Sequence, residues 1–117
     1  QAVCEAWKGP PIQRHLWVEA IFTFRVARPT AHYRTKGGLK EWAEVQRPTT
    51  RPDVLKLSRS TEDALTGVIW VDDAQNVTLV ANKEYTNDGA TGCTIEIRWP
   101  EEQQGGLKNN RKGVKAY

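Results

Sequence analysis

The stretch "RPDVLKLSRSTEDALTGVIWVDDAQ", residues 51–75, has carboxylates at both of its ends and helix-forming residues between them. Asp53 follows a proline and can cap the first turn of a helix with its carboxylate. Apolar side chains then recur at helical spacing, and Gly67 is placed to end the helix. A short apolar run and the adjacent Asp72 and Asp73 follow. The stretch therefore predicts an amphipathic helix with acidic residues beyond each end.

Segments typical of strands lie on both sides of this helix. "HLWVEAIFTFRV" (15–26), "NVTLVANKEYT" (76–86) and "CTIEIRW" (93–99) are rich in β-branched and aromatic residues. "NDGATG" between the last two is typical of a hairpin turn, so we expect these two strands to pair directly. Residues 27–52 form a long charged connection, in which "LKEWAEV" favours a short helix. This order predicts an α+β domain with a mixed or mostly antiparallel sheet covered by the central helix.

The totals fit one small domain over residues 1–117, with residues 105–117 as an extension or a basic arm. Two cysteines, Cys4 and Cys93, form neither a metal pair nor a disulfide framework and are expected to be ordinary thiols. No apolar run approaches the roughly 18 residues that span a bilayer, and no secretory signal is visible. We therefore expect a cytoplasmic protein without a membrane partner.

The net charge of +3, from 17 Lys plus Arg against 14 Asp plus Glu, is only mildly basic. The basic residues are clustered, however, in 25–40, in 47–59 and in the tail. Such clusters suit a polyanion, because binding is driven by phosphate neutralisation and counterion release. In the long connection, Arg and Lys side chains would bind phosphates while Tyr33 stacks on an exposed base. Solvated surface charges on a flexible loop are the alternative interpretation.

The paired carboxylates suggest a metal site. Mg²⁺ prefers oxygen ligands and often takes only one or two carboxylates from the protein. When the chain returns after a helix, the residues that flank the two ends of the helix can come close together. We therefore expect Asp53 and Asp73 to approach each other. The alternative is that Asp53 is only a cap and that the two adjacent aspartates form only a turn.

This ordered set resembles the RusA family of Holliday-junction resolvases. The resemblance is carried by Pro-Asp, the helix ending "DALTG", the apolar run and "DDAQ", and upstream by "FTFRVARPTAHY". It covers roughly residues 15–99. It implies a small endodeoxyribonuclease of bacteria or their phages, acting in DNA recombination and repair. It also implies a homodimer and branched DNA as the partner.

The family's functional positions can be carried over residue by residue. Its first aspartate falls on Asp53, and its "DDAQ" aspartates fall on Asp72 and Asp73, the second being the usual catalytic carboxylate. The family's helix lysine falls near Arg59. The resemblance thus implies catalysis by Asp53, Asp73 and Arg59, with Asp53, Asp72 and Asp73 holding Mg²⁺ or Mn²⁺. The expected DNA contacts are Arg28, His32, Tyr33, Arg34, Lys36, Lys40 and Lys56.

Leu55 departs from the family pattern, which has a second carboxylate there. The site then loses a ligand, recruits another such as Glu62, or binds no metal productively, with Lys56 offsetting charge instead. We expect a Mg²⁺-dependent endonuclease that cuts four-way or other branched DNA by paired nicks. The alternative is a junction-binding protein of the same fold whose cutting is weakened. A third hypothesis is a structural protein that kept the fold and lost DNA binding.

Overall fold

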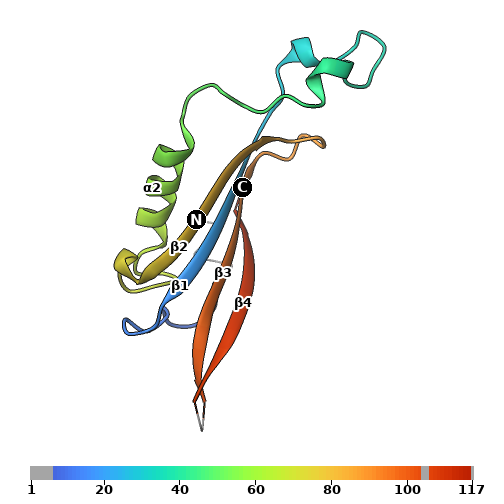
Figure 1. Cartoon of the computed structure of the whole chain (residues 1–117). Coiled ribbons are helices and arrows are strands. Elements are labelled where there is room, and N and C mark those ends of the chain that lie inside the picture. Colours follow the sequence, from blue (N-terminus) through green and yellow to red (C-terminus); the bar gives the residue numbers. More distant parts are fainter. Residues whose placement is uncertain (1–6, 104–105, 117) are drawn as a thin grey trace.

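The computed structural model describes residues 7–103 and 106–116, with side chains described as far as residue 100. Figure 1 shows one α-helix beside a twisted sheet, with an irregular segment beyond the end of the sheet. The regular elements are β1 (Val18–Val26), α2 (Val54–Leu65), β2 (Asn76–Tyr85), β3 (Gly92–Gln103) and β4 (Gly106–Ala116). Three single-turn 3-10 helices complete the described fold: η1 (Thr30–His32), η2 (Glu41–Ala43) and η3 (Asp73–Gln75).

The sheet is mixed, with the strand order β2-β1-β3-β4. β1 pairs in parallel with β2 and antiparallel with β3, and β3 pairs antiparallel with β4. The predicted α+β class with a mixed sheet is therefore confirmed. The predicted direct pairing of residues 76–86 with 93–99 is wrong, because β1 lies between these two strands. β1, α2 and β2 form a parallel crossover, which occupies one edge of β1 with β2 and leaves the other for β3.

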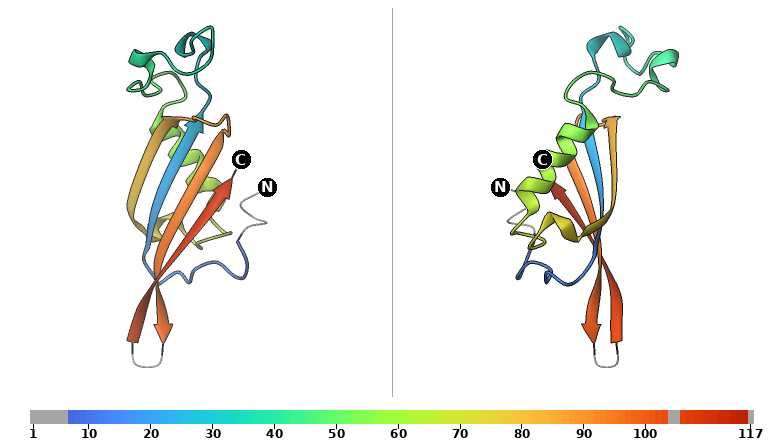
Figure 2. Two further views of the ribbon diagram at one scale, coloured as in Figure 1. Left: turned by 90° about the vertical axis from the view of Figure 1, so that its right-hand side faces the viewer. Right: turned by 60° about the vertical axis from the view of Figure 1, so that its left-hand side comes forward.

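The core lies between α2 and one face of the sheet (Figure 2). Alternate residues of β1 point into it, and Val18, Ala20 and Phe22 are fully buried. α2 contributes Leu65, which is also buried. On the opposite face of β1, Ile21 is 38% exposed, because no helix of the described chain covers that face.

α2 begins and ends at the residues that its sequence indicates. Asp53 is its N-cap, and Gly67 just beyond its end has a φ of +87°, a conformation that favours glycine. The apolar run after Gly67 does not form a strand. Ile69 and Trp70 are buried, and the Ile69 carbonyl accepts a 2.7 Å hydrogen bond from the backbone N–H of Ile12. Residues 66–71 thus turn under the end of the helix, and the chain runs back beside α2 only with β2.

Residues 27–52, here called the arm, lie beyond the end of the sheet (Figure 1). They contribute to an elongated molecule of 60 × 24 × 24 Å. The short helix predicted in "LKEWAEV" is confirmed as the single turn η2. At the other end of the chain, residues 106–116 pair with β3 as β4, whereas residues 105 and 117 lie outside the described residues.

The thiol of Cys93 is partly buried, and this burial raises its pKa to about 11, whereas Cys4 lies outside the described residues. Among the helices of the described chain, none has the length and apolar character needed to cross a membrane.

Candidate nuclease site and nucleic-acid interface

The N-terminal end of α2 is an exposed cap. The Asp53 carboxylate accepts a 2.9 Å hydrogen bond from the backbone N–H of Lys56, as capping predicts. Lys83 of β2 fixes the preceding segment, since its ammonium donates to the carbonyls of Thr50 and Pro52 at 2.6 and 3.0 Å. The position of the Asp53 carboxylate is therefore set by both the helix and the sheet, while the carboxylate itself faces solvent.

The other acidic end is built differently. The Asp72 carboxylate accepts a 3.0 Å bond from the Ala74 N–H, and the side-chain oxygen of Gln75 accepts from the N–H groups of Val71 and Asp72 at 2.8 and 2.9 Å. These bonds form a capping box around η3. The Gln75 amide nitrogen also donates to the carbonyls of Ile12, Gln13 and Leu16 at 3.3, 2.8 and 3.0 Å. Gln75 is 6% exposed, so this end is fixed from inside the fold.

This arrangement keeps Asp72 ionised. The hydrogen bond from the Ala74 N–H, then an interaction with the Asp73 side chain and the Arg14 guanidinium at 3.5 Å, lower the pKa of Asp72 below its ordinary value. Asp73 is the first residue of η3 and is exposed. Two adjacent carboxylates therefore lie at the surface here, and the charged form of Asp72 is favoured.

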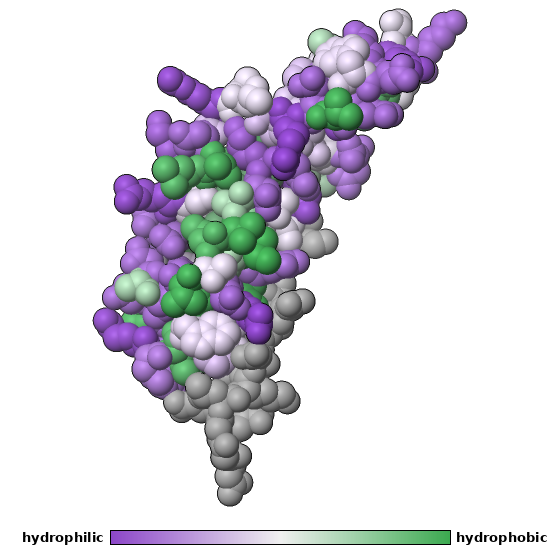
Figure 3. Space-filling view, viewed as in Figure 1, coloured by the Kyte–Doolittle hydropathy of each residue, from purple (hydrophilic) through white to green (hydrophobic). Residues whose placement is uncertain are grey.

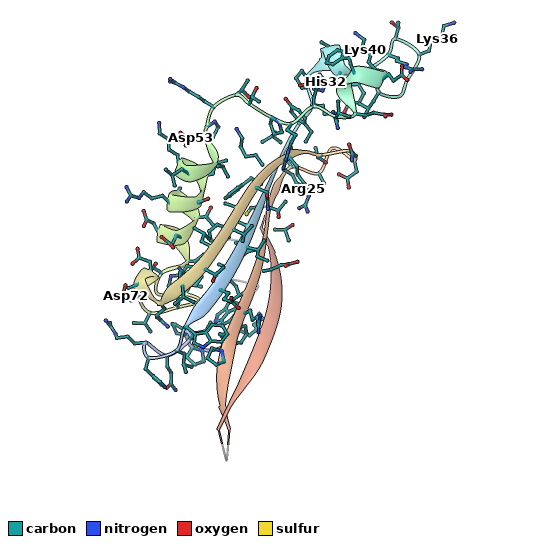
Figure 4. All side chains as sticks on the ribbon, viewed as in Figure 1. Arg25, His32, Lys36, Lys40, Asp53 and Asp72 are labelled. Atoms are coloured by element: carbon teal, nitrogen blue, oxygen red, sulfur yellow. The ribbon has the colours of Figure 1, made fainter. Side chains whose placement is uncertain are left out.

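The two acidic ends are far apart within one chain. Figure 4 shows Asp53 and Asp72 at opposite ends of α2, whose 12 residues at 1.5 Å each span about 18 Å. Among the described residues, no three acidic, histidine or cysteine side chains form a group that could hold a metal ion. The expected approach of Asp53 and Asp73 within one chain is therefore wrong, because residues 66–71 turn under the helix. These carboxylates of a single chain do not fit one divalent cation.

The solvent-facing surface of α2 carries the other predicted residues. Arg59, midway along the helix, and Lys56, in its first turn, are both exposed. Leu55 is 76% exposed, so it is not a core residue. Glu62 accepts a 3.0 Å bond from the Asn76 side chain and lies seven residues beyond Leu55, about 10 Å along the helix. Glu62 therefore lies in the C-terminal half of α2, away from position 55.

In the arm, Arg28 and His32 are engaged inside the protein. The Arg28 guanidinium donates to the Ala43 carbonyl at 2.7 Å and lies 5.1 Å above the centre of the Tyr85 ring. His32 is 7% exposed and meets Tyr85 and Trp42 edge to face, with ring centroids 5.1 and 5.2 Å apart. These two residues hold the arm together and tie it to β2.

The remaining residues predicted to contact DNA are available at the surface. Tyr33, Arg34 and Lys36 are exposed, and Lys40 is partly exposed, with its ammonium 5.9 Å from the centre of the Trp42 ring. Figure 4 shows Lys36 at the far tip of the arm, away from α2. The tip of the arm therefore presents cations to solvent at a distance from the acidic ends of the helix.

Sequence reasoning missed two residues that position the site. Gln75 stands three residues after Asp72, which is the spacing of a capping box, so a local signal for it was present. Lys83 had no such signal, because its contacts with Thr50 and Pro52 depend on how β2 lies against the start of α2.

The model of the family described as "Endodeoxyribonuclease RusA" matches residues 1–98 of this 117-residue chain. The chain belongs to the RusA family. The resemblance that residues 51–75 carry is thereby confirmed. A search among curated proteins and a search among solved structures each found no match. RusA membership implies endodeoxyribonuclease activity on Holliday junctions, and nucleases of this family are generally dependent on a divalent metal.

Proposed function

We propose that this RusA-family chain is a metal-dependent endonuclease that resolves four-way DNA junctions by paired nicks, in recombination and repair. Two features support the proposal beside family membership: the acidic residues at both ends of α2, and the arm that presents cations to solvent. The activity would belong in the cytoplasm of a bacterial cell or a phage-infected host.

Family membership carries this proposal, and the separation of Asp53 from Asp72 by the length of α2 bears on how the acidic site would be assembled. A homodimer would overcome this separation. If two copies of α2 lie side by side and antiparallel about a two-fold axis, Asp53 of one protomer lies beside Asp72 and Asp73 of its partner. The same axis creates a second identical site, which suits the two symmetric nicks that resolution requires. We therefore infer that each acidic site draws on both protomers.

Such a pair of protomers offers three carboxylates to one cation, which fits the oxygen preference and low protein-ligand count of Mg²⁺, or of Mn²⁺. A bound divalent cation would supply an activated water and neutralise charge on the phosphodiester. Arg59 is exposed midway between the two ends of α2. Its planar guanidinium can bind phosphate oxygens in a bidentate manner and so hold the scissile strand against the helix.

The exposed cations of the arm would bind the phosphate backbones of the four DNA duplexes that meet at the junction. Arg34, Lys36 and Lys40 are available for this, and Lys56 is exposed beside Asp53 at the start of α2. Arg28 and His32, in contrast, would act by keeping the arm in shape, because their side chains are occupied by Ala43, Tyr85 and Trp42. Binding of this kind should weaken steeply with salt.

The direct test uses a labelled synthetic four-way junction, with and without Mg²⁺, beside a linear duplex of the same sequence. Wild type should nick two opposite strands of the junction symmetrically, only with the metal, and Asp73→Asn should bind the junction without nicking it. Wild type that neither binds nor nicks the junction would contradict the proposal.

Leu55 favours a second candidate, a junction-binding protein with weakened cutting. It stands in the first turn of α2, 76% exposed, where the family pattern has a carboxylate. Leu55→Asp should fold normally, because it adds an exposed acidic residue to the positive end of the helix. Tight binding without nicking in wild type, with nicking in Leu55→Asp but not in Leu55→Asn, would establish this candidate. Efficient nicking by wild type would reject it.

A further inference from the structure

The arm exposes large apolar side chains in a segment that has six Lys and Arg residues against two Glu residues. Trp42 is 50% exposed, Tyr33 is 42% exposed and Val45 is 81% exposed. None of them contributes to the core beneath α2. Figure 3 shows the arm as a mostly hydrophilic extension with hydrophobic residues among the hydrophilic ones. Isolated exposed apolar residues need no explanation, whereas a half-exposed tryptophan that the fold holds in position does need one.

The ring of Trp42 is held from inside the arm. The buried His32 ring meets it edge to face, with the centroids 5.2 Å apart, and His32 is in turn packed against Tyr85 of β2 at 5.1 Å. Arg28 holds the neighbouring residue through its 2.7 Å bond to the Ala43 carbonyl. The backbone N–H of Lys40 also donates to the His32 carbonyl at 2.8 Å. One part of the indole is thus fixed while the rest faces solvent.

Trp42 has the carboxylates of Glu41 and Glu44 near it in the sequence, but cations outnumber carboxylates in the arm by six to two, which favours an anionic partner. The Lys40 ammonium lies 5.9 Å from the centre of its ring, and the loop from Tyr33 to Leu39 carries Arg34 and Lys36, both exposed. An aromatic ring with cations beside it suits a nucleobase attached to its phosphates, because the base stacks on the ring while the phosphates meet the cations. An apolar protein partner would have to desolvate these cations without compensation.

We propose that Trp42 is a stacking platform for an unpaired or unstacked nucleobase at the branch point of the DNA. This inference rests on the proposed junction substrate and adds to it a site that recognises the open branch. In an intact duplex the base faces are covered by neighbouring pairs, so the platform would act only where stacking is interrupted. It therefore supplies structure selectivity, which phosphate contacts alone do not.

The experiment measures binding without divalent metal, so that the DNA stays intact. The probes are a four-way junction and a linear duplex of the same sequence. Trp42→Ala should weaken junction binding by about 5- to 150-fold, the range expected for loss of one stacked base, and leave duplex binding nearly unchanged. Trp42→Phe should retain most of the selectivity. Val45→Ala, on the same arm and more exposed, is the matched control and should bind as wild type does.

Photocrosslinking gives a second readout. A 5-iododeoxyuridine placed at the branch point should crosslink to Trp42. Because Trp42 is the only aromatic residue in the segment 41–56, a crosslink mapped to that segment identifies it. The same nucleotide placed within a duplex arm should not. Junction binding equal to wild type in Trp42→Ala, without this crosslink, would overturn the inference and leave the nuclease proposal standing. An equal loss on junction and duplex would also overturn it, since Trp42 would then only support the arm. Absence of junction binding in wild type would overturn both.

Discussion

Asp53 and Asp72, which lie beyond the two ends of α2, are both helix N-caps, one of α2 and one of η3, and they are held in different ways. At the N-terminal end, Asp53 is exposed and its carboxylate caps the helix through the Lys56 N–H. At the other end, Asp72 belongs to a capping box whose second member, Gln75, is buried and reaches back to residues 12–16. The first end is a local surface feature and the second is part of the tertiary structure. Chemistry and stability should therefore be separable at Asp53 and closely coupled around Asp72.

The largest effect should come from Gln75→Ala. This change leaves two backbone N–H groups and three backbone carbonyls without the side chain that pairs them in the interior. We expect a loss of about 3 kcal/mol in the free energy of unfolding, because each buried unpaired group is costly. Urea denaturation checks it. A loss below about 1 kcal/mol would mean that the contacts of Gln75 stabilise the fold no more than the exposed cap at Asp53 does.

A smaller effect is expected at the other end. Asp53→Ala should lower the free energy of unfolding by about 1 kcal/mol, since it removes one exposed N-cap, and Asp53→Asn should be nearly neutral. Asp53→Asn should nevertheless abolish junction nicking, because an amide replaces the carboxylate. Thermal unfolding and the nicking assay on the same preparations check both. If Asp53→Asn nicks as well as wild type, Asp53 is only a cap.

The smallest effect concerns acid stability. The pKa of Asp72 in the folded chain lies below the ordinary value of 3.8, mainly because its carboxylate accepts the Ala74 N–H. A lowered folded pKa means that this stabilisation is complete above the unfolded pKa and is lost as pH falls through the folded pKa. The melting temperature of wild type should thus fall more steeply with acid below pH 3.8 than that of Asp72→Asn. Parallel curves would contradict this account of the capping box.

The features of α2 that could be predicted from sequence are local ones. The cap at Asp53 and the stop at Gly67 depend on residues within one or two turns, so both were correct. The pairing of β2 and β3 was predicted from the turn between them. This prediction failed because both strands pair with β1 instead. β1 lies some 50 or more residues away in the sequence, and the parallel crossover places it beside β2.

The candidate site shows the same limit. The residue types at Asp53, Asp72 and Asp73 identified the family, but their separation depends on where residues 66–71 run after the helix. In the arm, Arg28 and His32 were expected to contact DNA because they are basic and stand in a loop. In the structure, both side chains contact Tyr85 of β2. Both residues lie more than 50 positions from Tyr85, and no local pattern indicates such a contact.

The measurement that tests the central claim most directly mixes two inactive variants. Asp53→Asn and Asp73→Asn protomers are each prepared, confirmed to be inactive alone, and then co-refolded to form mixed dimers. If each acidic site draws on both protomers, a mixed dimer contains one site with both substitutions and one intact site, so single-strand nicking of the four-way junction should return. If each site lies within one chain, both sites of the mixed dimer carry a substitution. The absence of nicking by verified mixed dimers would contradict a site shared between protomers.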